Sequence, residues 1–170
     1  SYIPTAGATV TRAADVATVP IANVTYPTRT EVTGTELVTN GTFDTDTDWV
    51  KTVGCTITGG QGVFTSVGPG AGLQQAAGIV AGKTYRYTYD VVSLSSGFLS
   101  VQIGGTAEPS YNTTGTKTGV MTAVNSSNVY ILSRQAGTTA VVDNFSLKEV
   151  TPLAVSFGFK GLATYYDGGT

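Results

Sequence analysis

The stretch ELVTNGTF at residues 36–43, which runs on through an acidic loop to Trp49, is the point around which the fold is organised. Its apolar positions alternate as in a short β-strand. The Asn40-Gly41 pair that follows is typical of a sharp turn, because both residues tolerate positive φ. A single strand of this length cannot bury Leu37 and Phe43 by itself. The stretch therefore predicts a partner sheet.

The composition indicates one β-rich domain. The chain has 170 residues, of which 41% are hydrophobic and 12% charged, and it contains 22 glycines. A charged fraction well below the usual share of about 25% is typical here of a sheet protein with many turns. The net charge of −2 argues against nucleic acid and anionic membranes as partners. No apolar run reaches the roughly 20 residues needed to insert across a membrane.

Three segments follow from the positions of the prolines and of the alternating residues. Residues 1–35 contain three prolines and no sustained period, which predicts an extended arm or linker. Residues 36–150 read as short strands separated by Gly, Asn and Ser. Residues 151–170 predict a C-terminal arm, or a strand shared with a neighbouring chain or domain. Because arms without their own core need contacts elsewhere, we expect a homo-oligomer.

The expected strands each have one apolar and one polar face, as in antiparallel sheets stacked on one side. In the strand at 83–94, the tyrosines at 85, 87 and 89 share the apolar face, so core packing is favoured over a sugar-stacking platform. Cys55 alternates with Ile57, which predicts a buried, inert thiol. The prediction is an all-β, antiparallel two-sheet jelly-roll β-sandwich with extended N- and C-terminal arms. Its strands are expected near 36–40, 48–52, 54–58, 62–67, 71–77, 83–94, 97–104, 115–123, 128–134 and 138–149.

An ordered series of motifs resembles a known family. The motifs are LVTNGTF at 37–43 with Trp49, ITGG at 57–60, Gln75, AGKTY at 81–85 and VDNFSLKE at 142–149. This series resembles the carbohydrate-binding-module-like, galactose-binding-like β-sandwiches of bacteriophage tail-fibre and other virion structural proteins. The resemblance covers about 36–150. It implies a non-catalytic carbohydrate-binding adhesion module of a virion fibre, spike or decoration protein, located on the virion, with a glycan or host cell-surface polysaccharide as partner.

A second hypothesis belongs to a different class. The chain would then be a purely structural virion assembly protein, without ligand binding, whose arms link copies of itself or other virion proteins. An exposed groove at Phe98 and Gln102 would favour the binding module, whereas burial of that face between subunits would favour the assembly protein.

The sequence offers no strong catalytic constellation, so we expect no enzyme. The chain contains no histidine, which excludes Ser-His and Cys-His pairs. The glycine-rich segment at 68–72 is followed by no helix that could present amides to a phosphate, so it predicts a hairpin loop. Glycoside cleavage needs two carboxylates about 5–10 Å apart in a cleft, and the few acidic residues fall in no such motif.

We expect no cofactor, but a structural metal ion remains one of two hypotheses for the acidic loop. Asp44, Asp46 and Asp48 have the alternate spacing of oxygen ligands for a hard cation, but a plain solvated loop fits the same residues. The resemblance implies a structural calcium near the first strand and the last one, where this chain has Asp44 and Asp143.

The candidate sugar site lies on the face opposite to the predicted core. An exposed aromatic ring beside amide and guanidinium donors suits a sugar, which has an apolar face and polar edges. A subunit contact uses the same residue types, and a core or rim plug is favoured for Trp49 over a sugar platform. The candidate carbohydrate-binding residues are Phe98, Gln102, Arg86, Tyr130, Arg134 and Trp49.

Overall fold

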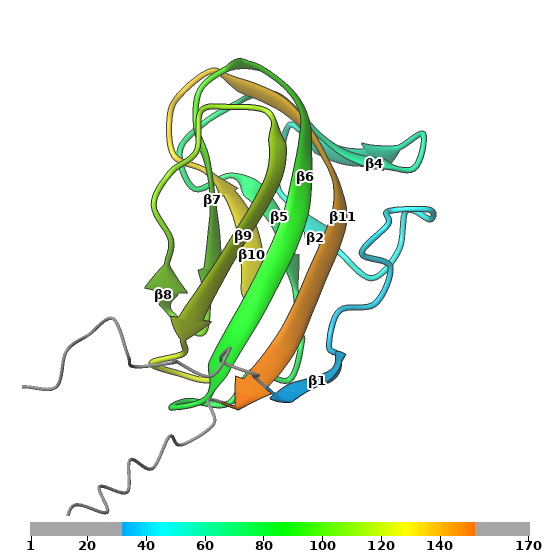
Figure 1. Cartoon of the computed structure of the whole chain (residues 1–170). Coiled ribbons are helices and arrows are strands. Elements are labelled where there is room, and N and C mark those ends of the chain that lie inside the picture. The colour runs from blue at the N-terminus through cyan, green and yellow to red at the C-terminus, as the bar shows by residue number, and fades with distance from the viewer. Residues whose placement is uncertain (1–31, 152–170) are drawn as a thin grey trace, which may run out of the picture. The chain divides into compact units, whose positions relative to one another are not determined.

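Two antiparallel β-sheets packed face to face make up the fold (Figure 1). The computed structural model describes residues 32–151, and this part of the chain contains strands and turns but no helix. It therefore contains no helix long and apolar enough to cross a membrane. The predicted all-β, two-sheet sandwich is confirmed. The expectations for residues 1–31 and 152–170 lie outside the described residues.

The larger sheet has six strands in the order β3-β4-β11-β6-β9, with β1 paired to β11 beside that path. Its strands are β1 (Val32–Glu36), β3 (Cys55–Thr58), β4 (Gln61–Val67), β6 (Thr84–Ser96), β9 (Gly115–Thr122) and β11 (Thr138–Thr151).

The smaller sheet has five strands in the order β2-β5-β10-β7-β8. Its strands are β2 (Val50–Lys51), β5 (Gly72–Gln75), β7 (Leu99–Ile103), β8 (Thr106–Ala107) and β10 (Val129–Ser133). Only β3–β4 and β7–β8 are consecutive strands of one sheet, so the chain otherwise crosses from sheet to sheet. These crossings give the jelly-roll arrangement.

The first strand differs from its prediction. The sequence predicts a strand at 36–40, whereas β1 ends at Glu36 and includes residues that the prediction assigned to the arm. Val32 is the register partner of Thr151, so β1 pairs with the end of β11. Leu37 N still donates to Leu147 O of β11 at 2.9 Å, and the chain then turns at Asn40, which has a φ of 51°.

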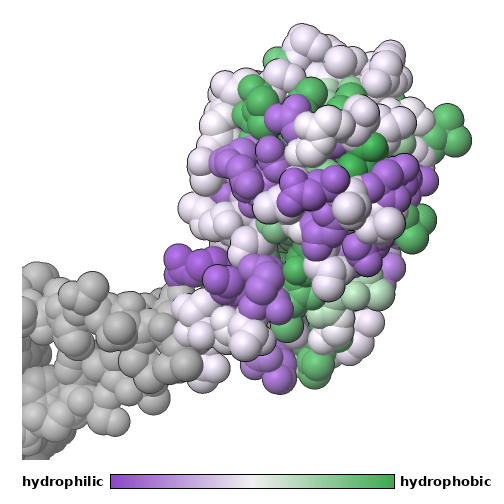
Figure 2. Space-filling model, turned by 90° about the vertical axis from the view of Figure 1, so that its right-hand side faces the viewer, coloured by the Kyte–Doolittle hydropathy of each residue, from purple (hydrophilic) through white to green (hydrophobic). Residues whose placement is uncertain are grey.

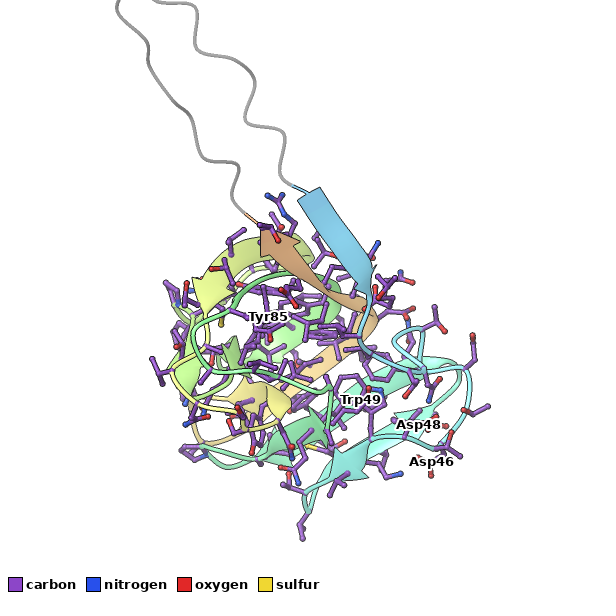
Figure 3. The ribbon with its side chains drawn as sticks, turned by 90° about the horizontal axis from the view of Figure 1, so that it is seen from below. Asp46, Asp48, Trp49 and Tyr85 are labelled. Atoms are coloured by element: carbon purple, nitrogen blue, oxygen red, sulfur yellow. The ribbon has the colours of Figure 1, made fainter. Side chains whose placement is uncertain are left out.

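The core contains the tyrosine row that the sequence predicts. Tyr85, Tyr87 and Tyr89 are each no more than 1% exposed, and Cys55 and Ile57 are buried as expected. Figure 3 shows Tyr85 inside the sandwich, among side chains of both sheets. Burying one large side chain contributes roughly 1.5–3 kcal/mol, so this row is a major part of the stabilising apolar surface.

Gly97 allows the chain to pass from β6 into β7, from one sheet to the other. Its φ is 87°, a left-handed conformation that favours glycine, and a Cβ there would lie 2.0 Å from Thr138 Oγ1. The two strands therefore join through a corner that other residues would strain. The corner places Leu99 on the inner face of β7, and this fixes which side chains of β7 point outward.

The described surface carries no single dominant apolar region in the view of Figure 2, where hydrophilic and hydrophobic groups alternate. Among residues 32–151, the exposed large apolar side chains are all valines, at positions 50, 53, 80, 92, 120 and 124. Scattered exposed apolar residues of this kind are normal on a globular protein.

Candidate functional site

One row of side chains crosses the outer face of the five-stranded sheet. Tyr130 on β10 is the register partner of Gln74 on β5 and of Gln102 on β7. Val50 on β2 lies opposite Gln74, and Ala107 on β8 lies opposite Gln102. Side chains of directly opposed residues share one face of a sheet. We call these five residues the outer row.

The outer row points away from the core. On β10, Val129 and Ile131 are fully buried, whereas Tyr130 between them is partly exposed. Likewise Val101 and Ile103 are fully buried on either side of the partly exposed Gln102. Because successive residues of a strand point to opposite faces, Tyr130 and Gln102 face solvent. This resolves the facing of β10, which the sequence leaves ambiguous.

A groove of about 170 Å³ lies beside Tyr130 on this face. Gly70 and Gly72 contribute no side chain to its lining. None of the lining side chains is charged at neutral pH. The lining residues are Thr52, Gly70, Gly72, Gln74, Gln102, Tyr130 and Leu132.

Arg134 lies at the rim of the same face. Its Nε donates a hydrogen bond to Ser100 Oγ, and its backbone N donates to Phe98 O at 2.9 Å. Ser100 is the register partner of Leu132, which lines the groove. The structure therefore brings three of the predicted residues, Gln102, Tyr130 and Arg134, to one outer face.

Phe98 is on the edge of this arrangement. It precedes β7, is half-buried and is not among the residues that line the groove. It precedes Gln102 by four positions, and a strand rises about 3.3 Å per residue, so the backbones of the two residues lie about 13 Å apart. The predicted pairing of Phe98 with Gln102 as one contact site is therefore replaced by a pairing of Gln102 with Tyr130.

Arg86 belongs to the other face of the sandwich. It lies on β6, where its register partners are Val120 of β9 and Lys148 of β11, and it is exposed. Tyr85 and Tyr87 on either side of it are buried between the sheets, so Arg86 points outward from the six-stranded sheet. The two outer faces of a sandwich point in opposite directions, and the predicted grouping of Arg86 with Gln102 does not hold.

Trp49 is a core residue and offers no sugar platform. It is 4% exposed, and its Nε1 donates a hydrogen bond to Asn40 O at 3.0 Å. Its ring lies 5.3 Å from that of Phe43 and 5.6 Å from that of Phe145, the second in an edge-on arrangement. Figure 3 shows Trp49 inside the sandwich. This corrects its inclusion among the sugar-binding candidates, because the turn at Asn40 folds the indole inward.

The aspartates of the acidic loop each make their own local contact and do not form a common metal site in the described part of the chain. Figure 3 shows Asp46 and Asp48 at the periphery of the fold. Within residues 32–151, no three His, Cys, Asp or Glu residues are arranged to hold a metal ion. The geometry therefore adds no support for calcium at Asp44 and Asp143. The individual contacts are Thr42 Oγ1 donating to Asp44, Lys51 pairing with Asp46, Thr47 Oγ1 donating to Asp48, and the Asn144 backbone N donating to Asp143.

Asp90 and Cys55, both outside the groove, have shifted pKa values. Thr116 Oγ1 donates to Asp90 at 2.6 Å and Asn144 Nδ2 donates at 2.9 Å, and these bonds hold the pKa of Asp90 below its usual value. Burial raises the pKa of the Cys55 thiol, and a weak contact from Thr52 Oγ1 opposes the shift. A thiol with a raised pKa is a poor nucleophile at neutral pH, in agreement with the predicted inert cysteine.

The sequence reasoning missed Gln74 and Leu132. Gln74 lies between the buried Leu73 and Gln75, so alternation alone places it outward. What the sequence does not contain is the register that sets Gln74 beside Tyr130. The neighbouring Gln75 is also polar but does not belong to the site, because it is buried. Its side-chain amide accepts a hydrogen bond from Thr39 N and donates one to Thr39 O.

Comparisons with known proteins leave the family open. No protein-family model matches the chain, and no curated protein matches its sequence. Among solved structures, one match is an arabinose-bound GH51 α-L-arabinofuranosidase, with a TM-score of 0.42 and 17% identity. The match covers 67% of this chain and 26% of the enzyme, so it spans only about a quarter of that protein. A likeness at this level carries no argument about function.

Proposed function

We propose that this chain is a non-catalytic carbohydrate-binding module, and that it acts as an adhesion module of a phage virion protein. The observation that carries the binding function is the outer row, in which Tyr130 stands between Gln74 and Gln102 beside an open groove. The virion setting, in a fibre, spike or decoration protein, rests on the ordered motifs of residues 36–150.

The chemistry of the groove suits a sugar ring. A phenol ring presents an apolar face and a hydroxyl, and each glutamine amide both donates and accepts hydrogen bonds. Leu132 adds apolar surface, whereas the Thr52 hydroxyl is held by the Gly72 backbone, donating to its O and accepting from its N. A sugar offers a matching C–H face and a rim of hydroxyls, so one ring can satisfy both kinds of surface at once.

A binding role is favoured over hydrolysis at this groove. Glycoside hydrolysis by two carboxylates requires both groups to flank the scissile bond. The groove is lined by amide, hydroxyl, phenol and apolar groups, with no carboxylate among its lining residues. The groove can therefore hold a glycan but offers no general acid and no nucleophile of that kind.

The affinity is expected to be weak. The groove is open to solvent, so few contacts are formed at once and each competes with water. Such a site supports dissociation constants of about 10 μM to 1 mM. Several copies of a module on one particle would raise the overall avidity, and this fits an adhesion role.

The position of Lys117 is relevant to the second hypothesis, in which the protein serves only in assembly. β9 is an edge strand of the six-stranded sheet, and Lys117 on it is nearly buried. Its Nζ donates to Thr113 Oγ1 at 2.9 Å and to Thr114 O at 2.8 Å. Inward-pointing charges of this kind are a device against edge-to-edge pairing of sheets. Assembly by extending the sheet at β9 is therefore disfavoured. Assembly through the arms concerns residues outside the described part of the chain.

The proposal is tested by affinity electrophoresis of the full chain in gels that contain xylan, arabinan, galactan, β-glucan or mannan. We expect retardation by at least one polysaccharide. Tyr130→Ala should remove the retardation, and Gln102→Ala should weaken it. Arg86→Ala, on the opposite outer face, is the matched control and should migrate as the unmodified chain does. Equal retardation of Tyr130→Ala and the unmodified chain would overturn the proposed site, and no retardation by any polysaccharide would overturn the function.

A further inference from the structure

We infer that the groove holds one ring of a longer, uncharged glycan chain, and that this chain crosses the strands along the outer row. The inference rests on the proposed carbohydrate-binding function and adds the class of ligand and the direction in which it lies. It follows from the size of the groove, the continuity of the row and the absence of charge among the lining residues.

The groove is too small for a complete oligosaccharide. Closed pockets for small molecules measure about 300–1,000 Å³, whereas this groove measures about 170 Å³ and is open to solvent. A ligand seated here must extend beyond it onto the surface of the sheet. A compact ligand would leave most of the outer row unused.

The outer row gives the direction of that extension. It includes one residue from each of the five strands, with Val50 at one end and Ala107 at the other. Neighbouring strands lie about 4.8 Å apart, so four spacings make the row about 19 Å long. Val50 is 59% exposed and Ala107 is also exposed, so neither end is closed. A chain can therefore enter at one end and leave at the other.

Two cationic side chains near the row have hydrogen-bond partners. Lys51, beside Val50 on β2, pairs with Asp46, and Arg134 donates to Ser100 in the neighbouring row. The row itself contains two amides, one phenol and two apolar side chains. An anionic sugar would find no free cation among the lining residues of the groove, whereas a neutral sugar matches every group in the row.

The probes for the test are neutral oligosaccharides of one to six units, prepared from whichever of the five polysaccharides retards the full chain most. Titration calorimetry should give an affinity for the hexasaccharide at least about thirtyfold higher than for the monosaccharide, since each further contact adds to binding. Polygalacturonate fragments of equal length provide the charged comparison and should bind at least about tenfold more weakly.

Val50→Asp tests the end of the row. It should weaken the hexasaccharide at least about fivefold and leave the disaccharide within about twofold, because only the longer chain reaches the end. Val92→Asp is the matched control: Val92 is 49% exposed on β6 in the other sheet, so this variant should bind both ligands normally.

Each outcome bears on a different claim. Equal affinities for the monosaccharide and the hexasaccharide, or tighter binding of the charged fragments, would overturn this inference and leave the carbohydrate-binding function standing. Failure of every polysaccharide to bind would overturn the function itself, and the inference with it. A hexasaccharide affinity that Val50→Asp leaves unchanged would show that the ligand does not follow the outer row.

Discussion

Gly119 on β9 lies directly opposite Tyr87 on β6, and the absence of a side chain at 119 is what makes room for the tyrosine ring. A Cβ at position 119 would lie 2.6 Å from Tyr87 Cε1 and 2.7 Å from its hydroxyl oxygen. The Tyr87 hydroxyl lies 3.2 Å from that of Tyr111, so the ring is held at both ends and cannot easily move aside.

Gly119→Ala should therefore destabilise the sandwich by about 1–3 kcal/mol, the usual cost of overpacking a core. The free energy of unfolding in chemical denaturation measures this change. Gly68→Ala is the control, because a Cβ at Gly68 would have no neighbour within 4 Å, and it should change the stability by less than about 0.5 kcal/mol. Equal effects of the two substitutions would contradict the packing of Tyr87 against β9.

The burial of Trp49 leads to a second prediction. Trp49→Ala should cost about 3–5 kcal/mol of unfolding free energy, as expected for a large aromatic side chain removed from a core. Trp49→Phe should cost clearly less, because a ring remains to contact Phe43 and Phe145. Trp49 is the single tryptophan of the chain, so its fluorescence should shift to the red on unfolding but stay unchanged when a glycan binds. Quenching by a bound glycan would place Trp49 at the binding site.

The lowered pKa of Asp90 predicts that the free energy of unfolding decreases slightly at acid pH. Its folded pKa is depressed by bonds from Thr116 and Asn144, so its stabilising contribution is present above the unfolded pKa of about 3.9 and is lost as the pH falls through the folded value. Asp90→Asn should lose stability at neutral pH and should show a weaker dependence on pH between about pH 4 and pH 2. Because Asp90 is partly exposed, solvent screens the interaction and the effect should be modest. Parallel curves of unfolding free energy against pH would contradict this role.

Much of the fold follows from local patterns in the sequence. The alternation in 83–94 identifies the buried tyrosines because a strand shows its period of two directly. The Asn-Gly pair at 40–41 likewise marks a turn from residue preferences alone. The predicted position of the first strand is wrong because β1 has no row of buried side chains of its own. Its position is set by pairing with β11, which is distant in the sequence.

The candidate site depends on information that no single strand contains. Alternation places Gln102 outward, but only the register of β10 with β5 and β7 sets Gln74, Tyr130 and Gln102 side by side. The same alternation places Arg86 outward without saying from which sheet. For Trp49 the sequence favours a core or rim position over a sugar platform, and the structure places it in the core.

The central claim, that a glycan binds on the outer face of the five-stranded sheet, is tested most directly by assigned ¹H–¹⁵N spectra of the full chain titrated with the neutral hexasaccharide. The account predicts that the backbone amides of residues 72–74, 101–103 and 129–132 shift progressively and reach saturation. It also predicts that the Gln74 and Gln102 side-chain amides move with them. Amides around Arg86 and Val120, on the opposite face, should stay in place. Shifts confined to β6 and β9, or no shift at millimolar ligand, would contradict the account.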